Sequence, residues 1–142
     1  MEDTFNLERF IQAQVSSYDS ALNEIKNDRK SNHWMWYIFP QLRDLGKSET
    51  SKFYAIKNRE EAISYYNHPV LGKHLKEITL AFLSIQNKST EDILGRPDHY
   101  KMKSCMTLFH FIQNDTDIFM KVLEKYYHGE FCRNTKKQLE NK

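Results

Sequence analysis

Residues 30–42 of the chain read KSNHWMWYIFPQL, the densest aromatic segment in a largely polar sequence. On a helix the side chains from Trp34 to Phe39 point in every direction, and on a strand they occupy both faces. Either geometry buries the segment on more than one side, so we expect it to run through the interior. Aromatic side chains dominate core energetics, and the segment as a whole is therefore interpreted as core scaffold. Its polar ends, His33 and Gln41, are the places where the edge of a binding site could form.

Size and composition indicate an ordinary globular protein. The 142 residues are enough for one domain with one core, and 39% of them are hydrophobic while 28% are charged. The 21 basic and 19 acidic residues nearly balance and form no long block of one sign, so no nucleic-acid partner is expected. The longest apolar run is far shorter than the ~20 residues of a membrane-spanning helix, so no membrane partner is expected either.

Cysteine usage and the amino end bear on location. Cys105 and Cys132 are too few and too far apart to indicate a secreted disulfide framework, and the first residues do not resemble a signal peptide. We therefore expect a cytoplasmic protein.

Helical periodicity extends over most of the chain. The clearest stripe has apolar residues three or four apart at Leu71, Leu75, Ile78, Phe82 and Ile85. Further helices are predicted at about residues 7–14, 18–25, 59–66 and 97–113 and after Asp115, with a short capped turn at 89–95.

Local signals mark several ends of these helices. Asn58 is a predicted cap, with Glu61 returning the bond of a capping box, and Asp115 is another predicted cap. Pro69 suits the first turn of the helix that follows it, and Asp44-Leu45-Gly46 predicts a turn or helix exit.

Strand patterns of period two are nearly absent, and the four glycines leave little room for hairpin turns. We therefore predict a mainly α fold: a single compact multi-helix domain over residues 1–142, with little or no β-sheet. The charged tail, residues 132–142, is predicted to fray.

Familiar chemical motifs are missing from the sequence. The six histidines contain no HxxxH or HxH pair, and no GxSxG, Walker A or Rossmann glycine pattern occurs. We expect no metal and no cofactor. Cys105 is interpreted as a small apolar core residue rather than a nucleophile.

The predicted helix after Pro97 carries a second group of candidates. Lys101 falls on its apolar side, where a lysine is costly unless its stem reaches solvent or its charge meets an anion. Ser104 lies between two apolar edges, and Thr107 lies on the polar strip of the same helix. For each of these residues a structural role and a ligand-binding role both stay open.

The sequence contains several uncommon motifs in a characteristic order: FNLERFIQAQ, HWMWYIFPQLRDLGKS, HPVLGKHLKE, DILGRPD and KMKSCMTLF. Over nearly the whole chain they resemble a widespread, mostly bacterial family of domains of unknown function, the one numbered eighteen-ten, whose members often carry the label calpastatin. The resemblance implies a compact, mainly helical cytoplasmic domain with no established activity. Calpastatins as a class inhibit a calcium-dependent protease through long disordered repeats, so the label does not suit a short compact chain.

The resemblance implies that the following residues of this chain are characteristic of the family: His33, Trp34, Trp36, Phe39, Pro40, Gln41, Gly46, Ser48, Tyr54, Pro69, Gly72, Lys101, Ser104, Met106 and Thr107. Cys105 departs from the pattern, where the resemblance implies a small hydroxyl residue, and this argues further against thiol catalysis.

Two classes of function fit these observations. The first is a small-molecule site, catalytic or not, for an anionic metabolite with an aromatic ring, such as a nucleotide or an ADP-ribose-like compound. RFIQAQ is also similar to a helix of the ADP-ribose-processing NADAR proteins. In this hypothesis the catalytic acid or base is His33, and the ligand-binding residues are Trp34, Trp36, Gln41, Lys101, Ser104 and Thr107.

The second class is a non-catalytic helical module that binds another protein or itself, favoured by the surplus of aromatic residues and the eight tyrosines. The sequence leaves the oligomeric state open. The two classes differ in whether His33, Trp34, Gln41 and Lys101 converge on one concave surface.

Overall fold

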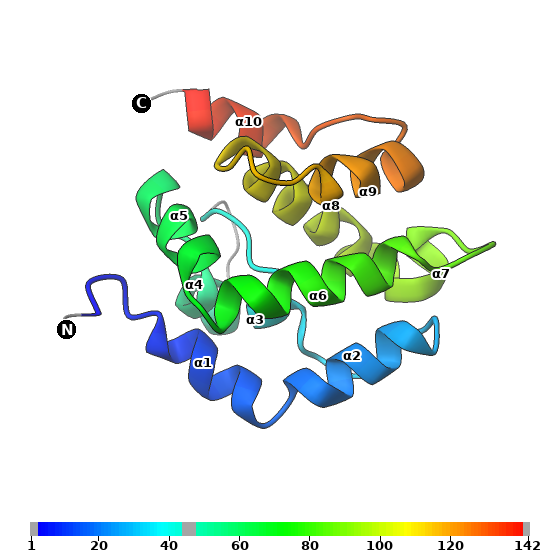
Figure 1. Cartoon of the computed structure of the whole chain (residues 1–142), viewed down its shortest axis with the longest axis horizontal. Coiled ribbons are helices and arrows are strands. Elements are labelled where there is room, and N and C mark those ends of the chain that lie inside the picture. The colour runs from blue at the N-terminus through cyan, green and yellow to red at the C-terminus, as the bar shows by residue number, and fades with distance from the viewer. Residues whose placement is uncertain (1–2, 44–47, 141–142) are drawn as a thin grey trace.

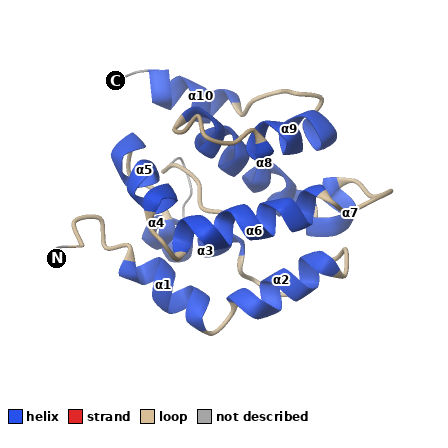
Figure 2. Cartoon of the chain, viewed as in Figure 1, coloured by secondary structure: helices blue, strands red, loops and turns tan. Residues whose placement is uncertain are grey.

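The computed structural model describes residues 3–43 and 48–140, and these form ten helices (Figures 1 and 2). In chain order they are α1 (Glu8–Val15), α2 (Tyr18–Lys26), α3 (Met35–Ile38), α4 (Glu49–Tyr54), α5 (Arg59–Asn67), α6 (Leu71–Leu83), α7 (Thr90–Leu94), α8 (Arg96–Phe111), α9 (Ile118–Tyr127) and α10 (Arg133–Glu140). The described residues contain no strand beyond an isolated parallel bridge between Leu42 and Ile56. The predicted mainly α fold is confirmed.

Two long helices organise the packing. In Figure 1, α6 crosses the middle of the molecule, with α1 and α2 on one side and α8, α9 and α10 on the other. α6 packs against α2, α5 and α9, while α8 packs against α5, α7, α9 and α10. Because neighbours surround α8, its side chains from Cys105 to Phe109 are fully buried.

The aromatic run lies in the interior, as predicted. Trp34 and Phe39 are 1% and 0% exposed, whereas Trp36 is only partly buried. The run forms a single helical turn, α3, because Pro40 cannot continue a helix. The buried indole N–H of Trp34 donates to Glu24 Oε1 at 2.8 Å, which satisfies its one polar group.

A buried ion pair ties the amino end to the middle of the chain. Arg9 Nη2 lies 2.7 Å from Glu61 Oε2, with side chains 5% and 0% exposed. The same guanidinium also donates to the backbone carbonyls of Phe5, Asn6, Phe53 and Ala55 at 2.7–3.0 Å. Every guanidinium N–H therefore has an acceptor.

The predicted cap at Asn58 is confirmed, since its side chain accepts the Glu61 N–H at 2.9 Å. The reciprocal bond differs from the prediction: Glu61 Oε1 accepts the N–H of Lys57, at 2.8 Å, instead of that of Asn58. Ser89 and Asp92 do form a complete capping box at the start of α7, where a capped turn was predicted.

Other helix ends depart from prediction. Pro69 lies before α6 and not in its first turn. The His68 ring caps this helix, since its Nδ1 accepts the backbone N–H groups of Val70 and Leu71 at 3.1 and 3.3 Å. Asp115 does not cap α9, because its carboxylate accepts the Tyr66 hydroxyl at 2.5 Å.

Residues 133–140 of the tail form α10. Thr135 and Leu139 are 3% and 6% exposed, so burial of one face offsets the charge of the other. The predicted turn at Asp44-Leu45-Gly46 lies outside the described residues.

Candidate functional site

The bridge between Leu42 and Ile56 fixes the backbone of the candidate site. Arg43 N donates to Ile56 O at 2.8 Å, and Ile56 N donates to Gln41 O at 2.9 Å. Leu42 and Ile56 are 5% and 0% exposed. Since side chains alternate along extended backbone, the residues on either side of them face outward. Gln41 and Arg43 are thereby placed at the surface beside Ala55 and Lys57.

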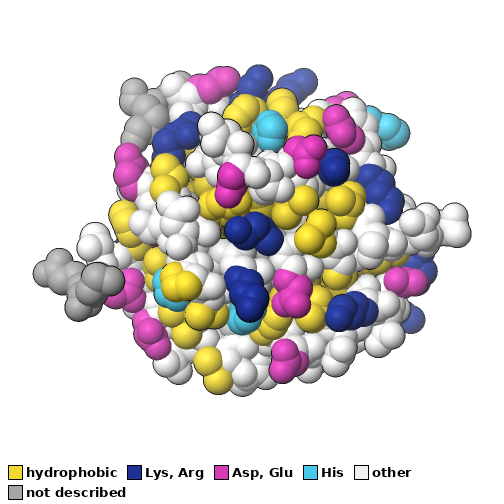
Figure 3. All heavy atoms as spheres, in the orientation of Figure 1, with side chains coloured by type: hydrophobic (Ala, Val, Ile, Leu, Met, Phe, Trp, Pro, Cys, Tyr) yellow, Lys and Arg dark blue, Asp and Glu magenta, His cyan; other side chains and the backbone are white. Residues whose placement is uncertain are grey.

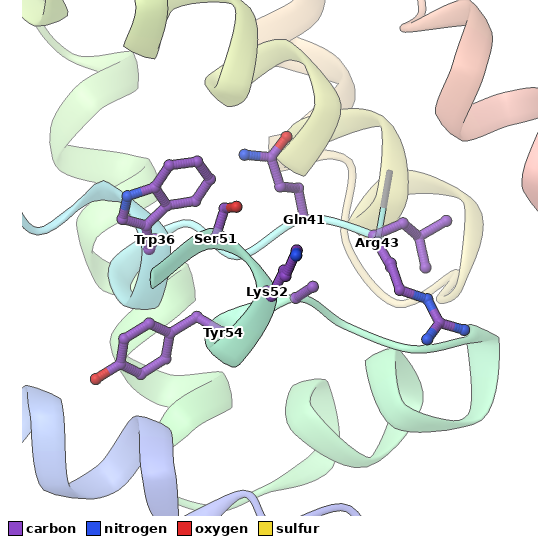
Figure 4. Close-up of a pocket in the computed structure, with 8 residues that line it drawn as sticks. Trp36, Gln41, Arg43, Ser51, Lys52 and Tyr54 are labelled. Carbon is purple, nitrogen blue, oxygen red and sulfur yellow. The ribbon is translucent and has the colours of Figure 1, made fainter. Parts of the chain in front are cut away.

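A narrow hollow lies beside Trp36. It is lined by Trp36, Gln41, Leu42, Arg43, Ser51, Lys52, Tyr54 and Ala55, and we call it the Trp36 hollow. In Figure 4 the indole and the Gln41 side chain flank Ser51, with Lys52 between Trp36 and Arg43. The cavity volume is about 20 Å³, room for about one water molecule.

The side chains around the hollow are held differently. Ser51 is buried, and its hydroxyl donates to Ser48 O at 2.9 Å. The Tyr54 ring points away from Gln41 in Figure 4 and packs against Phe10, with ring centroids 5.8 Å apart. Burial raises the pKa of the Tyr54 hydroxyl, which therefore stays neutral near pH 7. Lys52 and Arg43 are exposed and free to turn.

A second, wider hollow adjoins the first. It is lined by Asn6, Arg9, Arg43, Lys52, Phe53, Ala55 and Lys57, has a volume of about 250 Å³, and is called the basic hollow below. Arg43, Lys52 and Ala55 line both hollows, so the two lie next to each other.

The exposed cations of the basic hollow have no acidic partner among the described residues. Among the described residues, Arg43, Lys52 and Lys57 form no ion pair with a carboxylate. Arg9 differs from these three, since Glu61 neutralises it and backbone carbonyls use its remaining donors. Three exposed cations therefore face solvent along the two hollows.

Lys101 was expected either to reach solvent or to meet an anion, and it meets one within the chain. Its Nζ lies 3.1 Å from Asp98 Oδ1 and 3.7 Å from the centroid of the Trp36 ring system. Lys30 pairs with the other oxygen of Asp98 at 2.8 Å and lies 5.2 Å from the Trp34 ring. Lys101 does not line the Trp36 hollow, although it touches the same indole.

The remaining predicted residues lie in different surroundings. His33 is exposed and forms no hydrogen bond or ion pair with the described residues. Trp34 is enclosed, so its indole is not available as a stacking wall. Of the four residues that were expected to converge, His33, Trp34, Gln41 and Lys101, only Gln41 lines the Trp36 hollow. Trp36 lines it as well, and Lys101 contacts that indole from outside the hollow.

Ser104 and Thr107 contact Cys132 instead of the Trp36 hollow. The Ser104 hydroxyl donates to Cys132 Sγ at 3.2 Å, and the Thr107 hydroxyl accepts the Cys132 N–H at 2.9 Å. Ser104 and Cys132 line a separate, open cavity of about 650 Å³ between α8 and the segment 129–136.

The two cysteines are in opposite environments. Burial alone would raise the pKa of Cys132, but hydrogen bonds from the Ser104 and Thr135 hydroxyls and from backbone N–H groups outweigh it and hold that pKa below its usual value. Cys105 is fully buried, which raises the pKa of its thiol. Its interpretation as a core residue agrees with this burial.

Sequence reasoning missed Arg43, Lys52 and Lys57. Single exposed cations are common on any surface, and only the bridge and the packing of α4 bring these three to adjoining hollows. One signal for a basic site was available in the sequence: Arg43 directly follows the aromatic segment, two residues after Gln41.

The described residues define an all-helical protein whose surface carries an aromatic hollow beside a basic one. The chain matches the model of a protein family of unknown function, DUF1810, over residues 4–139, and it belongs to that family. This confirms the resemblance seen in the sequence.

A solved structure shares the whole fold. The crystal structure of the conserved hypothetical protein Rv1873 from Mycobacterium tuberculosis is 41% identical, with a TM-score of 0.96, and the match covers 99% of this chain and 100% of that one. A comparison with curated proteins gave no match.

Two further properties of the described residues bear on the class of site. None of their helices combines the length and apolar character needed to cross a membrane. Nowhere in the part of the chain that the structure describes do three or more His, Cys, Asp or Glu side chains gather as a metal site would require.

Proposed function

We propose that this protein binds a small anionic metabolite with an aromatic ring, of the nucleotide or ADP-ribose type, at the Trp36 hollow and the adjoining basic hollow. The observation that carries the proposal is that the two hollows share three lining residues, Arg43, Lys52 and Ala55. An indole and an amide lie at one end, and three cations without acidic partners among the described residues line the rest.

Trp36 supplies the aromatic contact. An indole binds a planar ring by stacking, and the Lys101 ammonium already occupies one face of the Trp36 ring. The ligand ring would contact the remaining face or the edge. At about 20 Å³ the hollow is too small for a ring as it stands, so the exposed Lys52 side chain has to turn aside.

Gln41 supplies polar specificity. Its backbone carbonyl is used in the bridge to Ile56, while no hydrogen bond of its side-chain amide is formed with the described residues. An amide with a free acceptor and free donors at the edge of a stacking surface can recognise the polar edge of a base.

His33 remains our prediction for a general acid or base, and it is separate from the binding proposal. Efficient proton transfer by a side chain needs a substrate atom within hydrogen-bond reach. Binding through Trp36 and the cations does not require His33. His33→Ala should therefore leave ligand affinity unchanged.

The test is a thermal-shift series with AMP, NAD and ADP-ribose. A ligand with a Kd of about 100 μM, present at about 1 mM, stabilises a protein by about 1.4 kcal/mol, which raises the Tm of a chain of this size by about 4 °C. We expect such a rise with at least one of the three. The double variant Arg43→Ala, Lys52→Ala should lose it while keeping its Tm without ligand.

The matched control is Lys137→Ala, which removes one exposed cation from α10, away from both hollows. No shift with any of the three compounds, or an equal shift in the double variant, would contradict the proposal.

The alternative, a protein-interaction module, makes a different prediction. The exposed large hydrophobic side chains of the described residues are Val15, Phe53, Val70, Leu80 and Tyr100. On the face in Figure 3, charged side chains are interspersed among the apolar ones. Self-association in light scattering together with no ligand response would favour this alternative.

A further inference from the structure

We propose that the charged part of the ligand is a diphosphate, bound in the basic hollow by Arg43, Lys57 and Lys52. The inference rests on the proposed function and adds to it the number of phosphoryl groups and the residues that hold them.

Backbone register places two of the cations side by side. In the parallel bridge Leu42 is paired with Ile56, so the next residues along the two segments, Arg43 and Lys57, are neighbours across the pairing. Both flank buried residues and are exposed on the outer side. Like charges at neighbouring positions of paired segments repel each other, and an anion between them converts this repulsion into attraction.

The third cation comes from α4. Lys52 lines both hollows, as Arg43 does, and in Figure 4 it lies between Trp36 and Arg43. A ligand whose ring contacts Trp36 therefore passes Lys52 before it reaches the Arg43–Lys57 pair. The order of groups along the site is ring, first phosphoryl group, second phosphoryl group.

Charge balance separates a diphosphate from a monophosphate. A phosphate monoester carries about −1.5 to −2 charges near pH 7, which leaves at least one of three cations unmatched. A terminal second phosphoryl group, as in ADP, adds further negative charge and supplies acceptors for the Arg43–Lys57 pair.

Two nearby charged residues, Arg9 and Glu61, pair with each other and do not change the number of cations available to a ligand. Arg9 on the wall of the basic hollow is neutralised by Glu61, and its donors are used within the chain. The Glu61 carboxylate is buried and accepts from Arg9 and from the Lys57 backbone, so it does not neutralise the Lys57 ammonium.

The experiment compares adenosine, AMP and ADP by calorimetric titration at one ionic strength with the full chain. We expect ADP to bind about tenfold more tightly than AMP, as charge-assisted hydrogen bonds to a second phosphoryl group require. Lys57→Ala should reduce the ADP affinity to about that of AMP and leave the AMP affinity within about twofold. Lys137→Ala is the matched control and should change neither.

The outcomes separate this inference from the proposed function. If AMP and ADP bind equally, or if Lys57→Ala weakens both to the same degree, the diphosphate assignment is wrong and the binding function stands. If none of the three compounds binds and none of the ligands in the thermal-shift series raises the Tm, the proposed function is wrong and so is this inference. Lys57→Ala must keep the wild-type Tm without ligand, which its exposed side chain leads us to expect.

Discussion

Glu61 carries three structural tasks that the sequence suggested only in part. Its N–H completes the cap by Asn58, one carboxylate oxygen accepts the Lys57 N–H, and the other pairs with Arg9. The pair is almost fully enclosed, so each charge depends on the other for its solvation. The capping residue thus also anchors α1 against the segment that carries the basic hollow.

Glu61→Gln should therefore be strongly destabilising. The substitution keeps the shape of the side chain but leaves the Arg9 cation buried without its counter-charge, so we expect a loss of about 3 kcal/mol in the free energy of unfolding. Urea denaturation measures it. Glu140→Gln, which removes the exposed partner of Lys136, serves as the control and should have no measurable effect. A loss as small as that of the control would contradict the assigned role of the buried pair.

The two cysteines give a second prediction at this scale. Cys132 is partly exposed with its pKa held low by hydroxyl and backbone donors, whereas Cys105 is buried with its pKa raised. Because the thiolate is the reactive form, iodoacetamide should alkylate Cys132 at least about tenfold faster than Cys105 near neutral pH. Mass spectrometry of the peptides gives both rates.

Ser104→Ala removes one donor to the sulfur, and it should slow the alkylation of Cys132. Equal rates at the two cysteines in the wild-type chain would show that these thiol environments are wrongly assigned.

At the scale of the elements, the junction of α5 and α6 depends on one glycine. A Cβ at Gly72 would lie 2.0 Å from the backbone oxygen of Tyr66, a distance that side-chain motion cannot relieve. Close approach of the two helices therefore requires the missing side chain. His68, between them, serves the first N–H groups of α6.

Gly72→Ala should separate α5 from α6 and destabilise the chain by about 1–3 kcal/mol, the usual cost of overpacking, despite the better helix propensity of alanine. Thermal unfolding followed by circular dichroism measures the change. The adjacent exposed position gives the control, Lys73→Ala, which should be nearly neutral. A stabilised Gly72→Ala variant would contradict the close contact.

The elements also show where sequence reasoning succeeded. Long amphipathic stripes such as Leu71 to Phe82 predicted helices, because burial of one face at period 3.6 is visible in the sequence itself. α10 was missed because only Thr135 and Leu139 are buried on it, and this one pair at helical spacing, with a single apolar member, is a weaker signal than the long stripe of α6. Asp115 was misread as a cap because its partner, Tyr66, lies 49 positions away.

The candidate site was only partly predictable for the same reason. Trp36 and Gln41 were identified because they lie in one aromatic segment. Lys52 and Lys57 lie near that segment only because of the packing of α4 and the Leu42–Ile56 bridge, and no local sequence pattern predicts these contacts. Lys101 was correctly singled out as a cation that needs a partner, and the pairing with Asp98 emerged only in the fold.

At the scale of the whole molecule, two partly buried histidines link stability to pH. The His74 ring stacks on Tyr18 of α2 at 3.7 Å, and its Nδ1 lies 2.8 Å from Oε1 of Gln14 in α1. The Gln14 amide nitrogen donates to Tyr37 O and to the Tyr65 hydroxyl, so its oxygen accepts and the proton is on Nδ1 of His74. Burial lowers the pKa of His74 and likewise that of His99.

The direction of the pH effect follows from these lowered values. Above the ordinary histidine pKa of 6.5 both folded and unfolded chains hold the rings neutral, and the stability is fully present. Below it the unfolded chain binds protons that the folded chain resists, so the free energy of unfolding should fall as the pH is lowered below about 6.5. Urea denaturation at several pH values should show this fall in the wild type and a flatter profile in His74→Gln, His99→Gln. An unchanged slope in that double variant would assign the effect to other groups.

The central claim is that a ring-bearing anion binds at Trp36, and the indole N–H signals in a nitrogen–proton NMR spectrum test it most directly. The chain has two tryptophans, so two such signals are expected, and Trp36→Phe identifies which is which. Titration with ADP should shift the Trp36 signal until it saturates, while the signal of Trp34, whose N–H is held by Glu24, stays in place. A Trp36 signal that does not move with saturating ADP, AMP, NAD and ADP-ribose would contradict the account.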